Sequence, residues 1–174
     1  MTRILLIRHA EPVESAGPGE QNDRPLSTAG HAAARALAAE LAHEPIAALY
    51  SSPYPRALQT VEPLAAARAL EVTIVADLRE RLLAPGDLPD WEEHCRRSFG
   101  DFGYALAGGE SSAAAQARAE AALATIARLH PGQTIAVASH GNLIALMLHA
   151  RDPSVGYAFW RAMPMPALYA IERE

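Results

Sequence analysis

The chain has 174 residues, half of them apolar, which suits one compact domain with a sizeable core. One cysteine, Cys95, excludes a disulfide framework within the chain and fits the reducing cytoplasm, where we expect the protein. The net charge of −5 without a basic tract argues against nucleic acid, and no apolar run is long enough for a membrane span or a signal peptide. A small phosphorylated partner stays open, because a few arginines in a cleft outweigh the global charge. The composition says nothing about the oligomeric state.

The chain begins with an unbroken apolar run, Ile4 to Ile7, which predicts a strand buried on both faces of a parallel sheet. A long loop follows over residues 10–26. Such a loop is usually functional in a compact domain. The pattern predicts further strands at 46–51, 72–75, 134–139 and 167–171, and helices at 27–43, 57–70, 111–129 and 143–149.

Two local signals and one change of composition add detail to these predicted elements. Ser27 is the expected N-cap of the first helix, and Pro63 is expected to kink the second. Residues 81–110 are rich in proline, glycine and aromatic residues, and we interpret them as an inserted cap with a short helix near 91–98. Strands that alternate with helices predict an α/β fold with a mainly parallel sheet, in a single domain of residues 1–174.

The seven histidines divide into two groups. His43, His130 and His149 fall near predicted helix ends, where an imidazole meets the negative end of the helix dipole, and His31 opens a helix. His94 lies in the cap, and its role stays open. By contrast, His9 and His140 directly follow buried strands, whose carboxyl ends meet at one edge of a parallel sheet.

Other polar residues follow the remaining strands. Arg8 precedes His9, Arg56 stands at the start of a helix after the second strand, and Glu80 follows the third. Arginine forks match phosphate oxygens, a neutral imidazole is a nucleophile, and a carboxylic acid protonates a leaving alcohol. A second, cationic histidine stabilises charge on phosphoryl oxygens. The chain has no nucleotide-binding glycine loop, no esterase elbow and no metal-ligand spacing, so the chemistry requires no cofactor or metal.

Several motifs resemble those of the histidine phosphatase superfamily, also called the phosphoglycerate mutase-like family. The resemblance runs along nearly the whole chain. It rests on Leu6-Ile7-Arg8-His9-Ala10-Glu11, Pro25-Leu26-Ser27-Thr28-Ala29-Gly30, Ser51-Ser52-Pro53-Tyr54-Pro55-Arg56-Ala57-Leu58-Gln59-Thr60, Leu78-Arg79-Glu80, Gly109-Glu110-Ser111 and Ser139-His140-Gly141.

This resemblance implies a three-layer α/β/α sandwich and metal-free chemistry. It implies that His9 attacks phosphorus and that Arg8, Arg56 and His140 hold the phosphoryl group. Glu80 would protonate the leaving group. Ser15 and Asn142 are further candidates for substrate binding.

The sequence also departs from the family pattern. Ala10 replaces a glycine, and Ser15 stands where an asparagine is common. The segment after Glu80 lacks the usual Gly-x-x-Glu-Gly, which leaves Glu11 as another carboxylate to consider.

We expect a phosphatase that hydrolyses a phosphomonoester of a small metabolite through a phosphohistidine. The alternatives are a mutase of the phosphoglycerate type, which a short cap disfavours, and a catalytically idle binding protein on the same fold. Specificity is expected in the cap. There the aromatic residues either line an apolar pocket or hold the cap in place: Trp91, Phe99, Phe102 and Tyr104. Arg96 and Arg97 are read as a solvated helix face.

Overall fold

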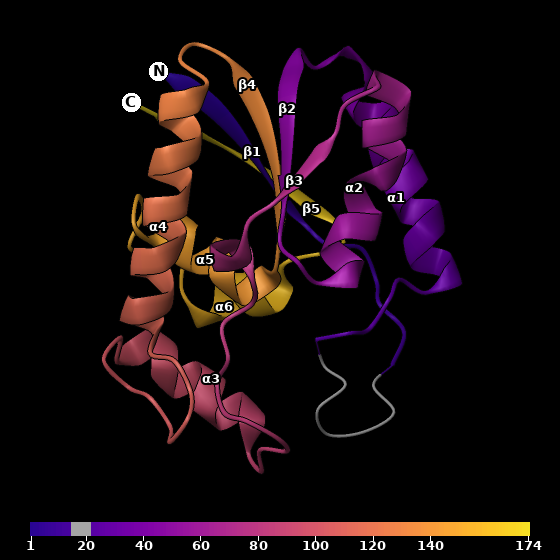
Figure 1. Cartoon of the computed structure of the whole chain (residues 1–174). Coiled ribbons are helices and arrows are strands. Elements are labelled where there is room, and N and C mark those ends of the chain that lie inside the picture. The colour runs from indigo at the N-terminus through magenta and orange to yellow at the C-terminus, as the bar shows by residue number, and fades with distance from the viewer. Residues whose placement is uncertain (15–21) are drawn as a thin grey trace.

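The computed structural model describes residues 1–14 and 22–174, and its centre is a five-stranded sheet of order β3-β2-β4-β1-β5 (Figure 1). The strands are β1 (Thr2–Arg8), β2 (Ile46–Ser51), β3 (Val72–Ile74), β4 (Thr134–Ser139) and β5 (Ala167–Arg173). The first four run parallel to one another, and β5 pairs antiparallel with β1. The predicted mainly parallel sheet is therefore confirmed.

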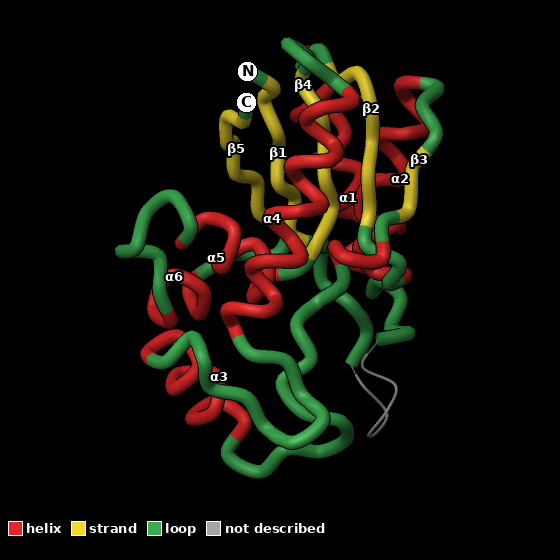
Figure 2. The backbone as a smooth tube through the Cα atoms, turned by 60° about the vertical axis from the view of Figure 1, so that its left-hand side comes forward, coloured by secondary structure: helices red, strands yellow, loops and turns green. Residues whose placement is uncertain are grey.

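Helices cover both faces of the sheet and make three layers (Figure 1). α1 (Thr28–Glu40) and α2 (Pro55–Arg68) lie on one face, and α4 (Ser112–Leu129) and α5 (Gly141–His149) lie on the other. α3 (Trp91–Gly100) lies beyond the lower end of the sheet as drawn, and α6 (Tyr157–Ala162) lies beside α5 (Figures 1 and 2). Within the described residues, no helix is long and apolar enough to cross a membrane.

β1 shows why its sequence lacks polar alternation. Leu5 and Ile7 belong to the core cluster under α1 and α2, whereas Ile4 and Leu6 belong to the cluster under α4 and α5. All four side chains are buried, because β1 is an inner strand with helices on both faces. The residues that follow β1 therefore leave a rigid, fully packed strand.

Some local predictions differ from the structure. α2 begins two residues earlier than expected, with Pro55 at its first turn, and Pro63 lies inside it as expected. α1 ends at Glu40, and a 3₁₀ turn continues to His43. α6 was not predicted, since a six-residue helix between proline-rich stretches has too few positions to show a helical period.

The cap segment, residues 81–110, contains α3 and several aromatic contacts. Phe99 and Phe102 pack against the main core. The Tyr104 hydroxyl is hydrogen-bonded to His94 Nδ1 at 2.6 Å, and the Arg97 guanidinium lies over the Tyr104 ring. Of the four cap aromatics named in the sequence, these three hold the segment in place. Trp91 differs, because 47% of its surface is exposed and it lines a pocket.

Candidate active site

The carboxyl ends of β1 and β4 bring the two selected histidines together. Arg8 is paired in register with Ser139, and the His9 N–H donates to the Ser139 carbonyl at 3.1 Å. His9 and His140 therefore follow adjacent positions of neighbouring strands, and their ring centroids lie 5.2 Å apart. The expectation that these strand ends meet at one edge is confirmed.

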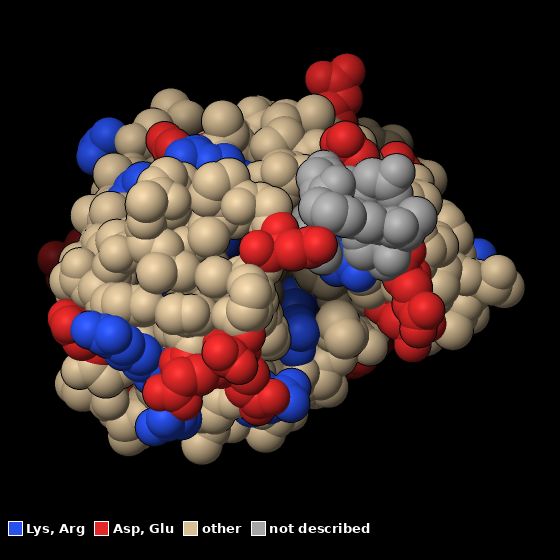
Figure 3. Space-filling view, turned by 90° about the horizontal axis from the view of Figure 1, so that it is seen from below, with Lys and Arg blue, Asp and Glu red and all other residues tan. Residues whose placement is uncertain are grey.

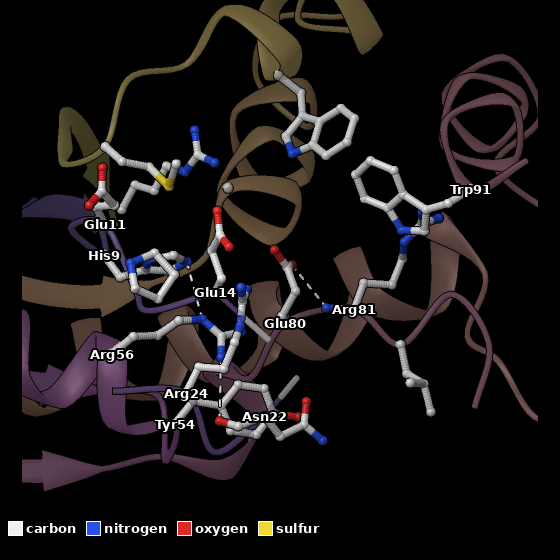
Figure 4. A pocket seen from close by; sticks show the side chains of 16 residues that line it. His9, Glu11, Glu14, Asn22, Arg24, Tyr54, Arg56, Glu80, Arg81 and Trp91 are labelled. Carbon is white, nitrogen blue, oxygen red and sulfur yellow. Dashed lines mark hydrogen bonds between the residues drawn. The ribbon is translucent and has the colours of Figure 1, made fainter. Parts of the chain in front are cut away.

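A cavity of about 450 Å³ opens at this edge of the sheet (Figure 4). Four of the predicted site residues line it, namely Arg8, His9, Arg56 and Glu80. The full lining comprises Arg8, His9, Glu11, Pro12, Glu14, Asn22, Arg24, Tyr54, Arg56, Glu80, Arg81, Leu82, Trp91, Gly141, Trp160 and Met165. His140 lies behind His9 with no exposed surface, and Ser15 falls outside the described residues.

The hydrogen bonds of His9 fix which of its ring nitrogens carries the proton. Nδ1 lies 2.7 Å from the carbonyl oxygen of Ala10, which can only accept, so Nδ1 bears the hydrogen. The Arg56 Nε donates to His9 Nε2 at 3.2 Å. Because arginine can only donate, Nε2 has a lone pair that faces the arginine. His9 is thus a neutral imidazole with its basic nitrogen on the side of Arg56.

Burial keeps both histidines neutral. The pKa of His9 falls to about 3, first because burial disfavours the cation and then because Arg56, Arg8 and Arg24 repel it. The hydrogen bond to the Ala10 carbonyl opposes this shift. The pKa of His140 is also lowered well below its ordinary value, mainly by burial. The expectation of a cationic second histidine is therefore wrong, because a fully buried imidazole surrounded by arginines does not hold a proton.

A glycine lets Arg8 reach the cavity. A Cβ on Gly141 would lie 2.8 Å from Arg8 Nε, so the guanidinium occupies the space that any larger residue would fill. The guanidinium donates to the main-chain carbonyls of Met163 and Pro164. Its Nε is buried and has no acceptor among the described residues. Burial lowers the pKa of Arg8, and an anion in the cavity would offset that cost.

Arg56 comes from the first turn of α2 and is only 5% exposed. Besides its bond to His9, it donates to the Asn22 carbonyl at 3.3 Å, and its guanidinium lies 5.1 Å from the Tyr54 ring centroid. Burial lowers its pKa. Its position at the positive end of a helix makes this a suitable place for an anion.

Glu80 is held by the start of α5. One of its carboxylate oxygens accepts from the N–H groups of Arg81 and Leu143, and the other accepts from Asn142. Asn142 therefore contributes through its main chain, whereas its side-chain oxygen is buried without a partner among the described residues. Glu80 thus caps a helix, and this capping fixes the direction of its carboxylate, which faces the cavity (Figure 4).

Two other glutamates near the site, Glu110 and Glu11, have structural partners. Glu110 forms a two-pronged ion pair with Arg118 at 2.7 and 2.8 Å. Arg118 also donates to the carbonyls of Asp77 and Arg79, in the segment that leads to Glu80. Glu11 lines the cavity but accepts from the Ser27 hydroxyl at 2.6 Å. Among these carboxylates, only Glu80 is held across the cavity by main-chain N–H groups.

Sequence reasoning missed two arginines in the cavity. Arg24 precedes the Pro25-Leu26-Ser27 motif, and a cation next to that motif was the available signal. Its charge acts on both His9 and Arg56, so it belongs to the same cationic group (Figure 4). Arg81 donates to Ser98 at 2.9 Å and to Ser112 at 2.8 Å, and it is 6% exposed.

Of the remaining histidines, His130 contacts Tyr50 and Gln133, and His149 contacts the Val155 carbonyl. Neither lines the cavity. Residues 1–14 and 22–174 contain no group of three or more His, Cys, Asp or Glu side chains arranged to hold a metal.

Comparisons with known proteins agree with this architecture. The chain aligns along its full length with Bacillus stearothermophilus YhfR, at 25% identity and a TM-score of 0.80, and covers 92% of that chain. A mycobacterial glucosyl-3-phosphoglycerate phosphatase in complex with VO3 gives 26% identity and a TM-score of 0.80, with 98% of this chain and 92% of the other covered.

A sequence relative and a family model give the assignment. Phosphoserine phosphatase 1 of Hydrogenobacter thermophilus is 30% identical in an alignment 158 residues long that covers 80% of this chain and 71% of that protein. The model of the histidine phosphatase superfamily (branch 1) matches residues 4–172. The chain therefore belongs to the histidine phosphatase superfamily.

Proposed function

We propose that the protein is a phosphatase that hydrolyses a phosphomonoester of a small metabolite through a phosphohistidine on His9. The observation that carries the proposal is the protonation pattern of the His9 ring. Nδ1 donates to a main-chain carbonyl, and Nε2 keeps a lone pair in a cationic cavity. A neutral imidazole with one fixed nitrogen is a competent nucleophile toward phosphorus.

The charge around His9 supports a phosphate ligand. Three of the arginines that line the cavity have a buried Nε with no hydrogen-bond acceptor among residues 1–14 and 22–174. They are Arg8, Arg24 and Arg81. Arg56 lies beside the nucleophilic nitrogen. A phosphate dianion accepts several guanidinium donors at once and offsets their desolvation. On binding, Arg56 Nε turns from His9 Nε2 to a phosphoryl oxygen, which frees the lone pair for attack.

The reaction then proceeds in two balanced steps. His9 Nε2 attacks phosphorus, the bond between phosphorus and the ester oxygen breaks, and Glu80 gives its proton to the leaving alcohol. The phosphoimidazolium keeps its Nδ1 hydrogen on the Ala10 carbonyl. Water then attacks phosphorus and gives a proton to the Glu80 carboxylate, which releases inorganic phosphate and restores neutral His9.

His140 has a supporting part in this scheme. Its Nε2 lies 2.7 Å from the Ser52 hydroxyl, and its Nδ1 is buried without a partner in the described residues. If Ser52 donates, Nδ1 bears the hydrogen and is available to a phosphoryl oxygen once the ligand is bound. Ser52 is itself fully buried, so it holds the ring in one orientation.

The test is to trap the intermediate. The wild-type protein, mixed with a radiolabelled phosphomonoester and quenched in alkali, should retain label that is lost in acid, as expected of a phosphohistidine. His9→Ala should abolish both the label and the release of phosphate, whereas His31→Ala, a histidine on α1 outside the cavity, should leave both unchanged. Turnover in His9→Ala would refute the mechanism. A mutase would return the group to an acceptor without releasing inorganic phosphate.

A further inference from the structure

The cavity has two chemically different parts. The phosphate end holds the arginines around His9. The rest of the lining includes four large apolar side chains, Leu82, Trp91, Trp160 and Met165. Leu82, Trp91 and Met165 are 46%, 47% and 44% exposed, which makes them three of the few large apolar residues that the described surface leaves in water. Exposed apolar side chains gathered around one pocket mark a binding surface.

The position of Trp91 relative to the reacting groups indicates which part of a substrate would contact this surface. In Figure 4, Trp91 lies on the far side of Glu80 from His9. In the proposed reaction, phosphorus sits next to His9 and the ester oxygen faces Glu80. The group attached to that oxygen therefore extends past Glu80 toward Trp91.

Trp91 is held from behind by an aromatic cluster. Its ring centroid is 5.6 Å from that of Trp160, and the Trp160 centroid is 6.0 Å from Phe99 and 5.7 Å from Tyr157. Trp160 is only 8% exposed. A rigid aromatic face loses little conformational freedom when a planar ring packs on it.

The charges near this surface disfavour an acidic leaving group. Glu80 lies between His9 and Trp91, so a carboxylate on the leaving group would pass close to a second carboxyl group (Figure 4). At the surface, Figure 3 shows acidic side chains beside an opening with basic side chains deeper inside. The basic residue on the Trp91 side is Arg81, and both of its terminal nitrogens already donate to serine hydroxyls. A carboxylate on the leaving group would therefore lie near Glu80, and on that side Arg81 has only its buried Nε left to donate.

We infer that the substrate is a phosphomonoester whose leaving group is an uncharged, planar aromatic or arylalkyl alcohol that packs on Trp91. This inference rests on the proposed function and narrows it. It also separates this chain from relatives named for phosphoserine and glucosyl-3-phosphoglycerate, whose leaving groups carry a carboxylate.

The experiment compares three esters of alkyl alcohols, so that an activated phenol does not drive the rate. These are benzyl phosphate, ethyl phosphate and O-phosphoserine, with kcat and KM measured separately. The wild-type kcat/KM for benzyl phosphate should exceed that for ethyl phosphate by about tenfold, the scale of burying one aromatic ring. O-phosphoserine should be a poorer substrate than benzyl phosphate.

Trp91→Ala should lower the ratio of benzyl to ethyl kcat/KM by about fivefold, chiefly through KM for benzyl phosphate. A purely structural role would lower both esters equally. Leu129→Ala removes an apolar side chain that is 66% exposed outside the cavity, and it should leave the ratio unchanged.

Two results distinguish the claims. Hydrolysis of O-phosphoserine faster than benzyl phosphate, or a ratio that Trp91→Ala leaves intact, would overturn the inference and leave the phosphatase standing. No hydrolysis of any ester and no label on His9 would overturn the proposed function, and the inference with it.

Discussion

Lowering the pH from about 7 to about 5 should reduce the free energy of unfolding by about 2 kcal/mol through His9 alone. In the folded protein, burial and the neighbouring arginines lower the pKa of His9 from its ordinary value of 6.5 to about 3. The unfolded chain therefore binds a proton on this ring at a pH where the folded protein does not.

The sign follows from that difference. Because the folded pKa is below the unfolded value, stability is fully present above about pH 6.5 and is lost as the pH falls toward 3. At about pH 5 a histidine of ordinary pKa is almost fully protonated, and protonating it stabilises the unfolded chain by about 2 kcal/mol. His140, whose pKa is lowered in the same direction by complete burial, adds a loss of the same sign.

Urea unfolding at a series of pH values measures this effect, with the fluorescence of Trp91 and Trp160 as the signal. Between the two pH values, His9→Gln should lose about 2 kcal/mol less than the wild-type protein, whatever its absolute stability. His31→Gln, on a partly exposed histidine of α1, should keep the wild-type dependence. If His9→Gln shows the same pH dependence as the wild type, His9 is not buried as a neutral ring, and the argument for its nucleophilic state is wrong.

Three further substitutions test the site through kinetics. Arg56→Ala should raise the activation barrier by about 2–4 kcal/mol, the cost of losing a preorganised charge donor. Arg128→Ala, on the exposed side of α4, should leave kcat/KM unchanged. A fall in kcat/KM of less than about threefold for Arg56→Ala would exclude Arg56 from the active site. Glu80→Gln should slow benzyl phosphate by about 100-fold or more but slow p-nitrophenyl phosphate far less, because nitrophenolate leaves without a proton; equal losses would contradict the role of Glu80 as an acid. Gly141→Ala should push the Arg8 guanidinium aside and lower kcat/KM by about tenfold or more, with little change in melting temperature. Wild-type kinetics in this variant would show that the guanidinium tolerates a Cβ placed 2.8 Å from Arg8 Nε.

The sequence was most informative where buried strands end in polar residues. The apolar run of β1 and the small apolar run of β4 located two inner strands, and parallel pairing then required His9 and His140 to meet. Glu80 followed from its place after β3. These predictions depend on local sequence and one topological rule, so they need no knowledge of side-chain packing.

What the sequence did not reveal depends on contacts between distant segments. Arg24 lies in a loop, and only the folded chain brings it to Arg56. The cap aromatics looked alike in the sequence, yet Trp91 faces the cavity while Phe99 packs into the core. The orientation of Glu80 is set by N–H groups of α5, more than sixty residues along the chain. No pattern within a single element encodes such partnerships.

The placement of β1 between β4 and β5 also has a consequence for how the protein opens and how it can change. Amides of an inner strand with partners on both sides exchange with solvent only when the whole domain unfolds, so the proposed nucleophile, His9, directly follows the most persistent part of the fold. The cap segment, residues 81–110, contains one ten-residue helix and no strand in the described structure. Its amides should exchange through smaller openings that leave β1 intact. Substitutions in the cap can therefore accumulate and redirect the protein to new leaving groups while the proposed phosphate chemistry at the end of β1 is preserved.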